Sequence, residues 1–286
     1  MTYKIAYQGE AGANSHIACI EAVPSHEPLP CRTFEDAFQA VEDGAAALAM
    51  IPTDNSVAGR VADIHHLLPH AALSIVGEHF FPVHHQLLVV KGTNASDIKS
   101  VHSHVHALGQ CRKVIRELGL DAVVAVDTAG AARELSEIKD KARAAIASRL
   151  AAEIYGLDIL RHDIEDESHN TTRFVILSPQ RNDAVAGSGP VMTSFVFRVR
   201  NVPAALYKAM GGFATNGVNM TKLESYQLEG RFSATQFYAE VEGHPQDKNL
   251  RLALEELAFF TSYMRVLGVY PASPYRAEIS RRMAEG

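Results

Sequence analysis

Short apolar runs alternate with amphipathic segments through the first half of the chain and beyond. A short continuous apolar run predicts a buried strand, and apolar residues three and four positions apart predict a helix that covers it. The pattern predicts strands over 4–8, 45–51, 73–81, 83–90, 121–126, 144–147 and 170–177, and helices over 14–23, over 104–118 and after residues 33, 128 and 148. Such alternation indicates an α/β fold with a largely parallel sheet.

Three details of this pattern set further expectations. Thr33 and Asp36 have the spacing of a capping box, which predicts the start of the second helix. Pro52 is expected to end the strand over 45–51. The successive apolar runs over 73–90 indicate a crossing of the chain between two lobes.

The second half of the chain has a different pattern. Residues 178–190 form its densest cluster of Gly, Pro and small polar residues, which predicts a linker and a domain boundary near residue 185. Beyond it, a strand through 195–199, a helix over 203–214, strands over 218–225 and 233–241, a helix over 246–262 and a strand over 264–269 follow in order. This βαββαβ order is typical of the ferredoxin-like fold. The expected domains are therefore 1–185 and 191–272, with a carboxyl-terminal tail over 273–286.

Composition narrows the class of partner. With 286 residues, 47% of them hydrophobic, the chain has enough apolar surface for two folded domains. A net charge of −6 without a long Lys/Arg run excludes an obvious nucleic-acid surface, and no apolar run is long enough for a membrane helix. Cys19, Cys31 and Cys111 are widely spaced and odd in number, which favours reduced thiols in a cytoplasmic protein. Residues 1–7 are predicted to be a strand and not a signal peptide, and we expect a small molecule as partner.

Polar clusters stand at the ends of two predicted strands. Asn170-Thr171-Thr172-Arg173-Phe174 opens the apolar run 175–177, and residues 53–56 follow the strand over 45–51. Ligand sites of α/β proteins lie at strand ends. Because side chains alternate along a strand, Asn170, Thr172 and Phe174 are expected on one side, and Thr171 and Arg173 on the other.

Each of these residues also has a purely structural interpretation. Thr172 suits strand packing, Arg173 suits a structural ion pair as well as a substrate carboxylate, and Asp54 suits a helix cap. His102, His104 and His106 lack a nearby carboxylate or Cys to complete a ligand set, so we expect no metal. His84 and His85 point to different sides and are expected to be surface or core histidines.

Four segments in order resemble the bacterial prephenate dehydratases. Residues 9–18 are similar to the family's glycine-rich segment ending in Ser-His-x-Ala, and residues 52–56 to its Pro-Ile-Glu-Asn-Ser loop. Residues 103–111 resemble its Ser-His…Ala-Leu-x-Gln-Cys segment, and Thr172-Arg173-Phe174 is its Thr-Arg-Phe. The resemblance covers nearly the whole chain, with Asp54 replacing Glu and Ala13-Asn14 replacing the commoner Thr-Phe.

The resemblance implies a carbon–oxygen lyase that converts prephenate to phenylpyruvate in phenylalanine biosynthesis without a cofactor. It implies a catalytic region of two α/β lobes, like a periplasmic solute-binding protein, with the active site in the cleft. Thr172 is then the catalytic residue at the leaving hydroxyl, with Asp54 or water as the source of its proton. The implied substrate-binding residues are Asp54, Asn55, Ser56, Ser103, Gln110, Ser148, Asn170, Arg173 and Phe174.

The resemblance also identifies the βαββαβ region as an ACT domain, which in this family binds phenylalanine at a dimer interface. A homodimer or homotetramer is implied, with phenylalanine as allosteric effector. Two departures fall in this region: Ala204 replaces a glycine, and Tyr226-Gln227 replaces Arg-Pro. The implied effector-binding residues are Ala204, Ala205, Leu206, Asn219, Met220, Leu223, Glu224 and Ser225.

Two alternatives stay open at this point. Arogenate differs from prephenate by an amino group in place of the keto oxygen, and one carboxylate such as Asp54 would accommodate it. A non-catalytic sensor would join a two-lobed binding module to an ACT domain. The co-occurrence of residues 54–56, 103–110 and Thr172 favours an enzyme, because a sensor has no need of all three clusters.

Overall fold

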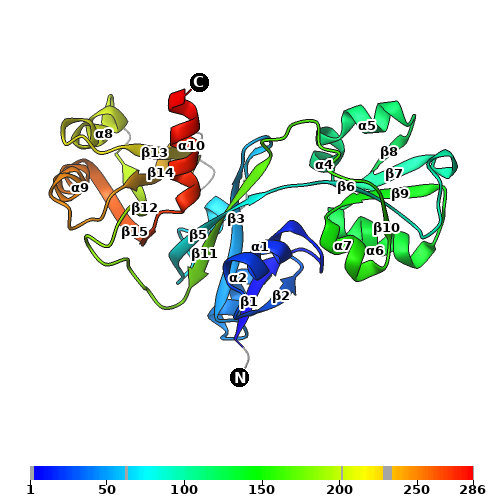
Figure 1. Ribbon diagram of the computed structural model, residues 1–286. Coiled ribbons are helices and arrows are strands. Elements are labelled where there is room, and N and C mark those ends of the chain that lie inside the picture. The colour runs from blue at the N-terminus through cyan, green and yellow to red at the C-terminus, as the bar shows by residue number, and fades with distance from the viewer. Residues whose placement is uncertain (1–2, 62–63, 201, 228–233, 286) are drawn as a thin grey trace. The chain divides into compact units, whose positions relative to one another are not determined.

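A computed structural model describes residues 3–61, 64–200, 202–227 and 234–285 (Figure 1). The chain forms two compact units: unit 1 contains residues 1–62 and 79–174, and unit 2 contains residues 63–78 and 175–286. The chain passes from one unit to the other within strands β5 (Ser74–Pro82) and β11 (Thr171–Ser178). The sequence pattern had grouped residues 63–78 with the amino-terminal region, whereas in the structure they belong to unit 2.

The first sheet of unit 1 has the order β2-β1-β3-β11-β5, with β4 paired to β3. Its further strands and flanking helices are β1 (Lys4–Gln8), α1 (Asn14–Ala22), β2 (Glu27–Cys31), α2 (Phe34–Glu42), β3 (Leu48–Asn55) and β4 (Gly59–Arg60). The capping box predicted for α2 is confirmed, because the Thr33 side chain accepts from Asp36 N and Asp36 accepts from Thr33 N.

Two proline-containing strands differ from the prediction. Pro52 lies inside β3, which continues to Asn55; the pairing of β3 with β1 ends at Met50, so no N–H of Pro52 is needed on that side. Strand β2 was not predicted, since its sequence Glu-Pro-Leu-Pro-Cys contains two prolines. It stands at the edge of the sheet, where proline is tolerated.

The second sheet of unit 1 has the order β10-β6-β9-β7-β8. Its elements are β6 (Gln86–Val89), β7 (Ser100–Ser103), α4 (Val105–Gln110), α5 (Arg112–Glu117), β8 (Asp121–Val124), α6 (Thr128–Ile138), β9 (Arg143–Ala147), α7 (Arg149–Tyr155) and β10 (Asp158–Arg161). The single helix predicted over 104–118 is wrong, because it breaks at Cys111. The Asp166 carboxylate accepts from the main-chain N–H of Arg112 and of Lys113, and so caps a new helix there.

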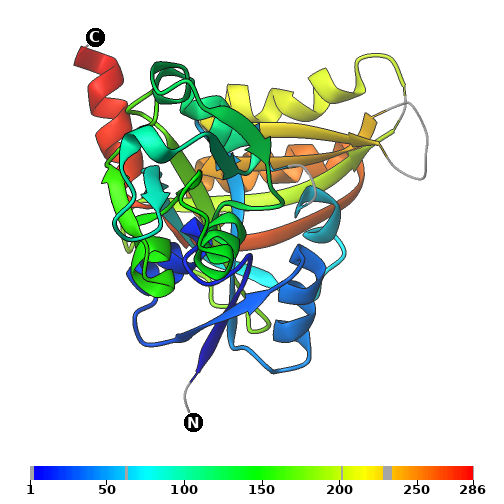
Figure 2. The ribbon, with the colours of Figure 1, turned by 90° about the vertical axis from the view of Figure 1, so that its right-hand side faces the viewer.

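Unit 2 contains the predicted βαββαβ order, in a sheet arranged β13-β14-β12-β15. Its strands run side by side in Figure 2. The elements are α3 (Ile64–Leu67), β12 (Val191–Val199), α8 (Ala205–Thr215), β13 (Met220–Gln227), β14 (Ala234–Glu242), α9 (Lys248–Phe260), β15 (Thr261–Pro271) and α10 (Pro274–Glu285). Residue 233, where β14 was predicted to begin, lies outside the described residues. The expected tail over 273–286 contains a helix, α10, and no described helix is long and apolar enough to cross a membrane.

Helices α8 and α9 cover one face of this sheet with an apolar core. Phe195 and Phe197 of β12 and Phe237 of β14 point to that face, together with Phe213 of α8 and Leu257 of α9. Phe195 stacks on Phe213 with ring centroids 5.9 Å apart, and Phe197 on Phe237 at 5.2 Å. Burial of these rings removes a large apolar area from water and so stabilises unit 2.

Residues 63–78 and α10 attach to other positions of the same unit. The Arg265 guanidinium donates to the carbonyl oxygens of Pro69 (3.2 Å) and Ala71 (2.9 Å). Arg276 of α10 forms a two-nitrogen ion pair with the buried carboxylate of Glu78, at 2.7 and 2.8 Å. Losing one partner of such a buried pair leaves an uncompensated charge, so the pair holds Glu78 firmly to α10 within unit 2.

The adjacent glycines of α8 are expected to respond oppositely to alanine. A Cβ at Gly211 meets no atom within 4 Å, so Gly211→Ala should stabilise the protein by about 0.5–1 kcal/mol through helix propensity. A Cβ at Gly212 would lie 2.9 Å from Glu256 Cβ and 3.2 Å from Ala253 O, so Gly212→Ala should be destabilising by about 1–3 kcal/mol. Urea denaturation of both variants measures the difference. Midpoints shifted in the same direction would contradict the packing of α8 on α9.

Candidate active site

The polar end of β3 and the polar start of β11 lie beside each other in unit 1. Thr53 Oγ1 donates to the carbonyl oxygen of Arg173 (3.3 Å). The main-chain N–H of Ser56 donates to the carbonyl oxygen of Thr171 (2.9 Å). These bonds join two segments more than a hundred residues apart in sequence. They bring Asn55 within hydrogen-bond distance of Thr172.

Asn55 connects the two strands through its side-chain amide. Its Nδ2 donates to Asn170 Oδ1 (2.8 Å) and to Thr172 Oγ1 (3.0 Å), while its Oδ1 accepts from the N–H groups of Val57 and Ala58. Asn170, which directly precedes β11, and Thr172 therefore point to the same side, as the predicted alternation requires. Because Thr172 Oγ1 accepts from Asn55, its hydroxyl hydrogen is left to donate elsewhere.

Gln110, at the end of α4, extends this network to the part of unit 1 that contains the second sheet. Its Oε1 accepts from Asn170 Nδ2 (2.9 Å) and lies 2.8 Å from Nε2 of His85. The network thus runs from Thr172 through Asn55 and Asn170 to Gln110 and His85. His85 was expected to be a surface or core histidine; the sequence contains no signal for its contact, which depends on a fold that brings residues 85 and 110 together.

Arg173 points away from this network, as the alternation predicted. Its side chain is 7% exposed, lies 3.5 Å from Asp54 Oδ2 and stands 5.9 Å from the centre of the Phe80 ring. The structural ion pair is therefore the interpretation that the geometry favours for Arg173 and Asp54. Phe174 is 1% exposed and packs in the core.

The three serines proposed for substrate binding donate to main-chain carbonyl groups. Ser56 Oγ donates to His169 O (2.6 Å), and Ser103 Oγ to Ile146 O (2.6 Å). Ser148 Oγ donates to Gly12 O (2.5 Å) and caps α7 by accepting from Ala151 N (3.0 Å). The serines brace the segments around the network, and the structure does not bring Ser103 or Ser148 into it.

The residues of the polar network lie within a part of the sequence that matches a known protein family. The model of the family described as prephenate dehydratase matches residues 5–182, which include every member of the network. The chain belongs to the prephenate dehydratase family. The match spans unit 1 from residue 5 onward and also includes residues 63–78 and 175–182, which belong to unit 2.

Relatives and solved structures extend this similarity beyond residue 182. The chain is 55% identical over 273 residues to the bifunctional N-acyl-homoserine lactone acylase/prephenate dehydratase of Komagataeibacter europaeus, covering 95% of this chain and 97% of that one. It is 38% identical over 278 residues to arogenate dehydratase/prephenate dehydratase 2, chloroplastic, of Arabidopsis thaliana, covering 94% and 72% of the two chains. The crystal structure of prephenate dehydratase from Arthrobacter aurescens in complex with L-Phe is 26% identical, with a TM-score of 0.87 over 99% of this chain and 100% of that one. The predicted α/β class, with a two-lobed catalytic region and a βαββαβ region, is confirmed.

One histidine–carboxylate cluster of this dehydratase has the composition of a metal site. Ligand atoms of His84, Asp163 and Glu165 lie within 4.8 Å of one another. Both Glu165 oxygens already have partners, His84 Nδ1 at 2.7 Å and the N–H of His85 at 2.9 Å. We therefore interpret the cluster as a brace that holds the main chain of His85.

The cysteines of the dehydratase are unsuited to nucleophilic chemistry. All three are free, with Cys19 and Cys111 buried and Cys31 half-buried. Burial raises the pKa of the Cys19 thiol to about 12, and burial also raises the pKa of Cys111 and of Cys31. Since the thiolate is the reactive form, these thiols stay protonated and unreactive near neutral pH.

Unit 1 contains a cavity of about 500 Å³ at the carboxyl ends of β1 and β2. Glu10, Arg32, Asp127 and Tyr155 contribute to its lining. The side chain of Glu10 is also paired with Arg133, at 2.6 Å, and Tyr155 donates to Ala11 O, at 2.9 Å. The polar network is not part of this lining, and the sequence motifs pointed to Gly9–Ala18 without predicting the contribution of Arg32 or Asp127.

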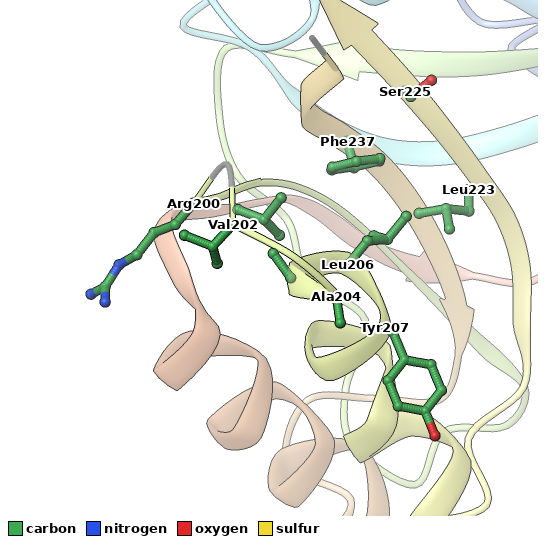
Figure 3. A pocket seen from close by; sticks show the side chains of 10 residues that line it. Arg200, Val202, Ala204, Leu206, Tyr207, Leu223, Ser225 and Phe237 are labelled. Atoms are coloured by element: carbon green, nitrogen blue, oxygen red, sulfur yellow. The ribbon is translucent and has the colours of Figure 1, made fainter.

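Unit 2 contains a cavity of about 590 Å³ beside the start of α8 (Figure 3). Of the residues predicted to bind an effector, five line it: Ala204, Ala205, Leu206, Leu223 and Ser225. Arg200, Val202, Tyr207 and Phe237 add to the wall and were not predicted.

The other predicted effector residues have different surroundings. Met220 packs against the apolar core, and Glu224 lies 3.7 Å from Lys222 Nζ. The carbonyl of Asn219 accepts from Glu242 N, at 3.0 Å.

Proposed function

We propose that Thr172 and Gln110 bind the reacting part of prephenate and that Thr172 assists the departure of its ring hydroxyl. The observation that supports this is the direction of the hydrogen bonds around them. Asn55 donates to Thr172, and Asn170 donates to Gln110, so the Thr172 hydroxyl hydrogen and the Gln110 amide hydrogens remain for a ligand. Neither group donates a hydrogen bond to any of the described residues.

The reaction needs donors at two places. The bond between the ring and its carboxylate breaks, its electron pair enters the ring, and the bond from the opposite ring carbon to the hydroxyl breaks. Carbon dioxide leaves, and hydroxide with one added proton leaves as water, so one proton is consumed. The aromatic ring of phenylpyruvate provides the driving force, and a donor at the leaving oxygen lowers the barrier.

The chain's neutral donors suit this chemistry. A cation held against the departing carboxylate would stabilise the substrate as much as the transition state, and so would not accelerate the chemical step. Arg173, the cation closest in sequence to Thr172, points to Asp54 instead. A Thr hydroxyl is a weak acid, so its proton must be replaced by relay from a second group.

Turnover of purified protein tests the function and separates the alternatives. Prephenate should give phenylpyruvate, which is followed by its absorbance. Arogenate should be assayed beside it, because relatives of 37–39% identity bear the name arogenate dehydratase. An N-acyl-homoserine lactone is the third substrate, since the 55% identical relative is named an acylase as well. A folded protein inactive on prephenate and arogenate would refute the proposal and favour the ligand-sensor alternative.

We further propose that the βαββαβ region of unit 2 is an ACT domain that binds phenylalanine and regulates the dehydratase as part of a homo-oligomer. The cavity of about 590 Å³ has mixed walls: Leu206, Leu223 and Phe237 are apolar, and Ser225 is polar. This lining suits an amino acid with an apolar side chain. The related structure from Arthrobacter aurescens was solved in complex with L-Phe, which supports the same ligand.

Ala204 gives this proposal a specific test. Its φ is +61°, a left-handed conformation that costs a residue with a Cβ about 1–2 kcal/mol. Ala204→Gly should therefore raise the free energy of unfolding by about 0.5–1 kcal/mol, after the entropy of glycine is deducted. Phenylalanine should bind the variant more tightly, because the methyl group of Ala204 no longer restricts the approach of the ligand to the main chain.

Calorimetric titration with phenylalanine and urea denaturation measure the two effects of Ala204→Gly. Ala205→Gly is the matched control, because residue 205 is the first of α8 and has no left-handed conformation to relieve. The control should lose stability. Absence of phenylalanine binding to an active wild-type oligomer would refute the regulatory proposal and leave the dehydratase function intact.

A further inference from the structure

We propose that His85 is a positioning residue for the dehydratase reaction: its ring N–H fixes the Gln110 amide so that the NH₂ group of Gln110 faces the substrate. The inference rests on the proposed function of Gln110 and adds a residue that none of the sequence motifs contains. Its basis is the order of donors and acceptors along the network, which has only one self-consistent direction.

The direction is set at the Asn55 end by main-chain groups. The N–H groups of Val57 (3.0 Å) and Ala58 (2.7 Å) require an acceptor, so Asn55 must present Oδ1 to them. Its Nδ2 then donates to Asn170 Oδ1, and Asn170 must present Nδ2 to Gln110. The atom of Gln110 that receives this bond is therefore its carbonyl oxygen.

The same logic determines the state of His85. Its Nε2 lies 2.8 Å from Gln110 Oε1, which is an acceptor, so the proton of the ring must be on Nε2. Gln110 Oε1 consequently accepts from two donors, one on His85 and one on Asn170. With the oxygen held on that side, the NH₂ group of Gln110 points the other way.

His85 is itself held firmly. Its side chain is buried, and its main-chain N–H donates to Glu165 Oε2 at 2.9 Å. Burial has the largest effect on the ring and lowers its pKa, and the nearby His84 lowers it further. The hydrogen bond to Gln110 and the charge of Glu165 act in the opposite direction and raise the pKa. The ring is therefore neutral near pH 7, and the single N–H of a neutral imidazole is committed to Gln110.

Gln110 needs this support because of where it stands. It is the last residue of α4, half-buried, and its side chain has three rotatable bonds. With only Asn170 as donor, the carbonyl oxygen is held at one point and the amide can rotate about it. Loss of one neutral hydrogen bond to a positioning group corresponds to a fall of roughly tenfold in kcat/KM.

The experiment compares three single variants in steady-state turnover of prephenate, with thermal unfolding of each. His85→Phe keeps a ring but removes the donor, and should lower kcat/KM roughly tenfold while the unfolding temperature stays near that of the wild type. His85→Gln restores an N–H donor and should recover most of the loss. His70→Phe is the matched control, since His70 is exposed and belongs neither to the network nor to the cluster of His84, Asp163 and Glu165; it should behave as the wild type.

A double-variant cycle keeps the test decisive if His85→Phe proves unstable. In a Gln110→Ala background, exchange of His85 for Gln or Phe should have no further effect on kcat/KM, because the group that His85 positions is gone. The inference would be overturned by any of three results. His85→Phe could turn over prephenate as the wild type does, the Phe and Gln variants could be equally impaired, or the losses in the double-variant cycle could be additive. Absence of phenylpyruvate from the wild type would instead refute the proposed function.

Discussion

Replacing Thr172 with valine is expected to lower kcat for prephenate by about 10²- to 10⁴-fold, the usual contribution of a positioned proton donor. Valine has nearly the shape of threonine, so the packing of β11 is preserved and only the hydroxyl is lost. The hydroxyl accepts from Asn55 Nδ2 at 3.0 Å, so its hydrogen remains for the leaving oxygen that we propose it binds. Steady-state kinetics and a binding assay for prephenate should show a large fall in kcat with a small change in affinity.

Thr172→Ser is the matched control for this prediction. Serine keeps the hydroxyl but loses the methyl group that fixes the rotamer of the β-branched side chain, so it should retain a substantial part of the activity. Equal activity of the valine variant and the wild type would show that the hydroxyl has no part in the reaction. Equal loss in both variants, with intact folding, would assign the residue a packing role.

The alternation of side chains along a strand made part of this site predictable. Asn170 and Thr172 were expected on one side and Arg173 on the other, and the contacts with Asn55 and with Asp54 have that arrangement. Alternation is a local property of extended backbone, so it is readable from sequence once a strand is recognised. The same holds for the capping box of α2, where both partners are three residues apart.

Contacts between distant segments were the part that sequence did not predict. The helix over 104–118 breaks because Asp166, more than fifty residues away, caps a new helix at Arg112. Ser103 stands at the end of a strand, where ligand-binding residues are expected. Its hydroxyl nevertheless donates to the carbonyl oxygen of Ile146. Both outcomes depend on tertiary structure that overrides local propensity.

Residues 63–78 illustrate the same limit at the level of domains. The apolar pattern of residues 73–78 is that of any strand of an α/β protein, and it does not show that they join unit 2. The relevant partners are Arg265, Gly268 and Arg276, almost two hundred residues later in the chain. A glycine in a strand is the one sequence signal of such a close approach.

Replacing Gly268 with alanine is expected to destabilise unit 2 by about 3 kcal/mol or more, which exceeds the usual cost of a surface substitution. A Cβ at residue 268 would stand 2.1 Å from the carbonyl oxygen and 2.7 Å from the Cβ of Ile75. Both strands are paired, so relief requires a shift of main chain and not of a flexible side chain. Because β5 continues from Ile75 to Pro82, and Val83 N donates to Asn170 O at 2.8 Å, turnover should fall as well.

Gly77→Ala is the matched control, since Gly77 lies two residues after Ile75 in the same strand. A Cβ there would lie 3.4 Å from the flexible end of Ile176, an ordinary contact, so the variant should stay within about 0.5 kcal/mol of the wild type. Urea denaturation and prephenate turnover of both variants provide the measurement. A Gly268→Ala protein with wild-type unfolding midpoint would mean that residues 63–78 separate from β15 at little cost. In that case the close approach of Ile75 to β15 would not help to hold β5 in place.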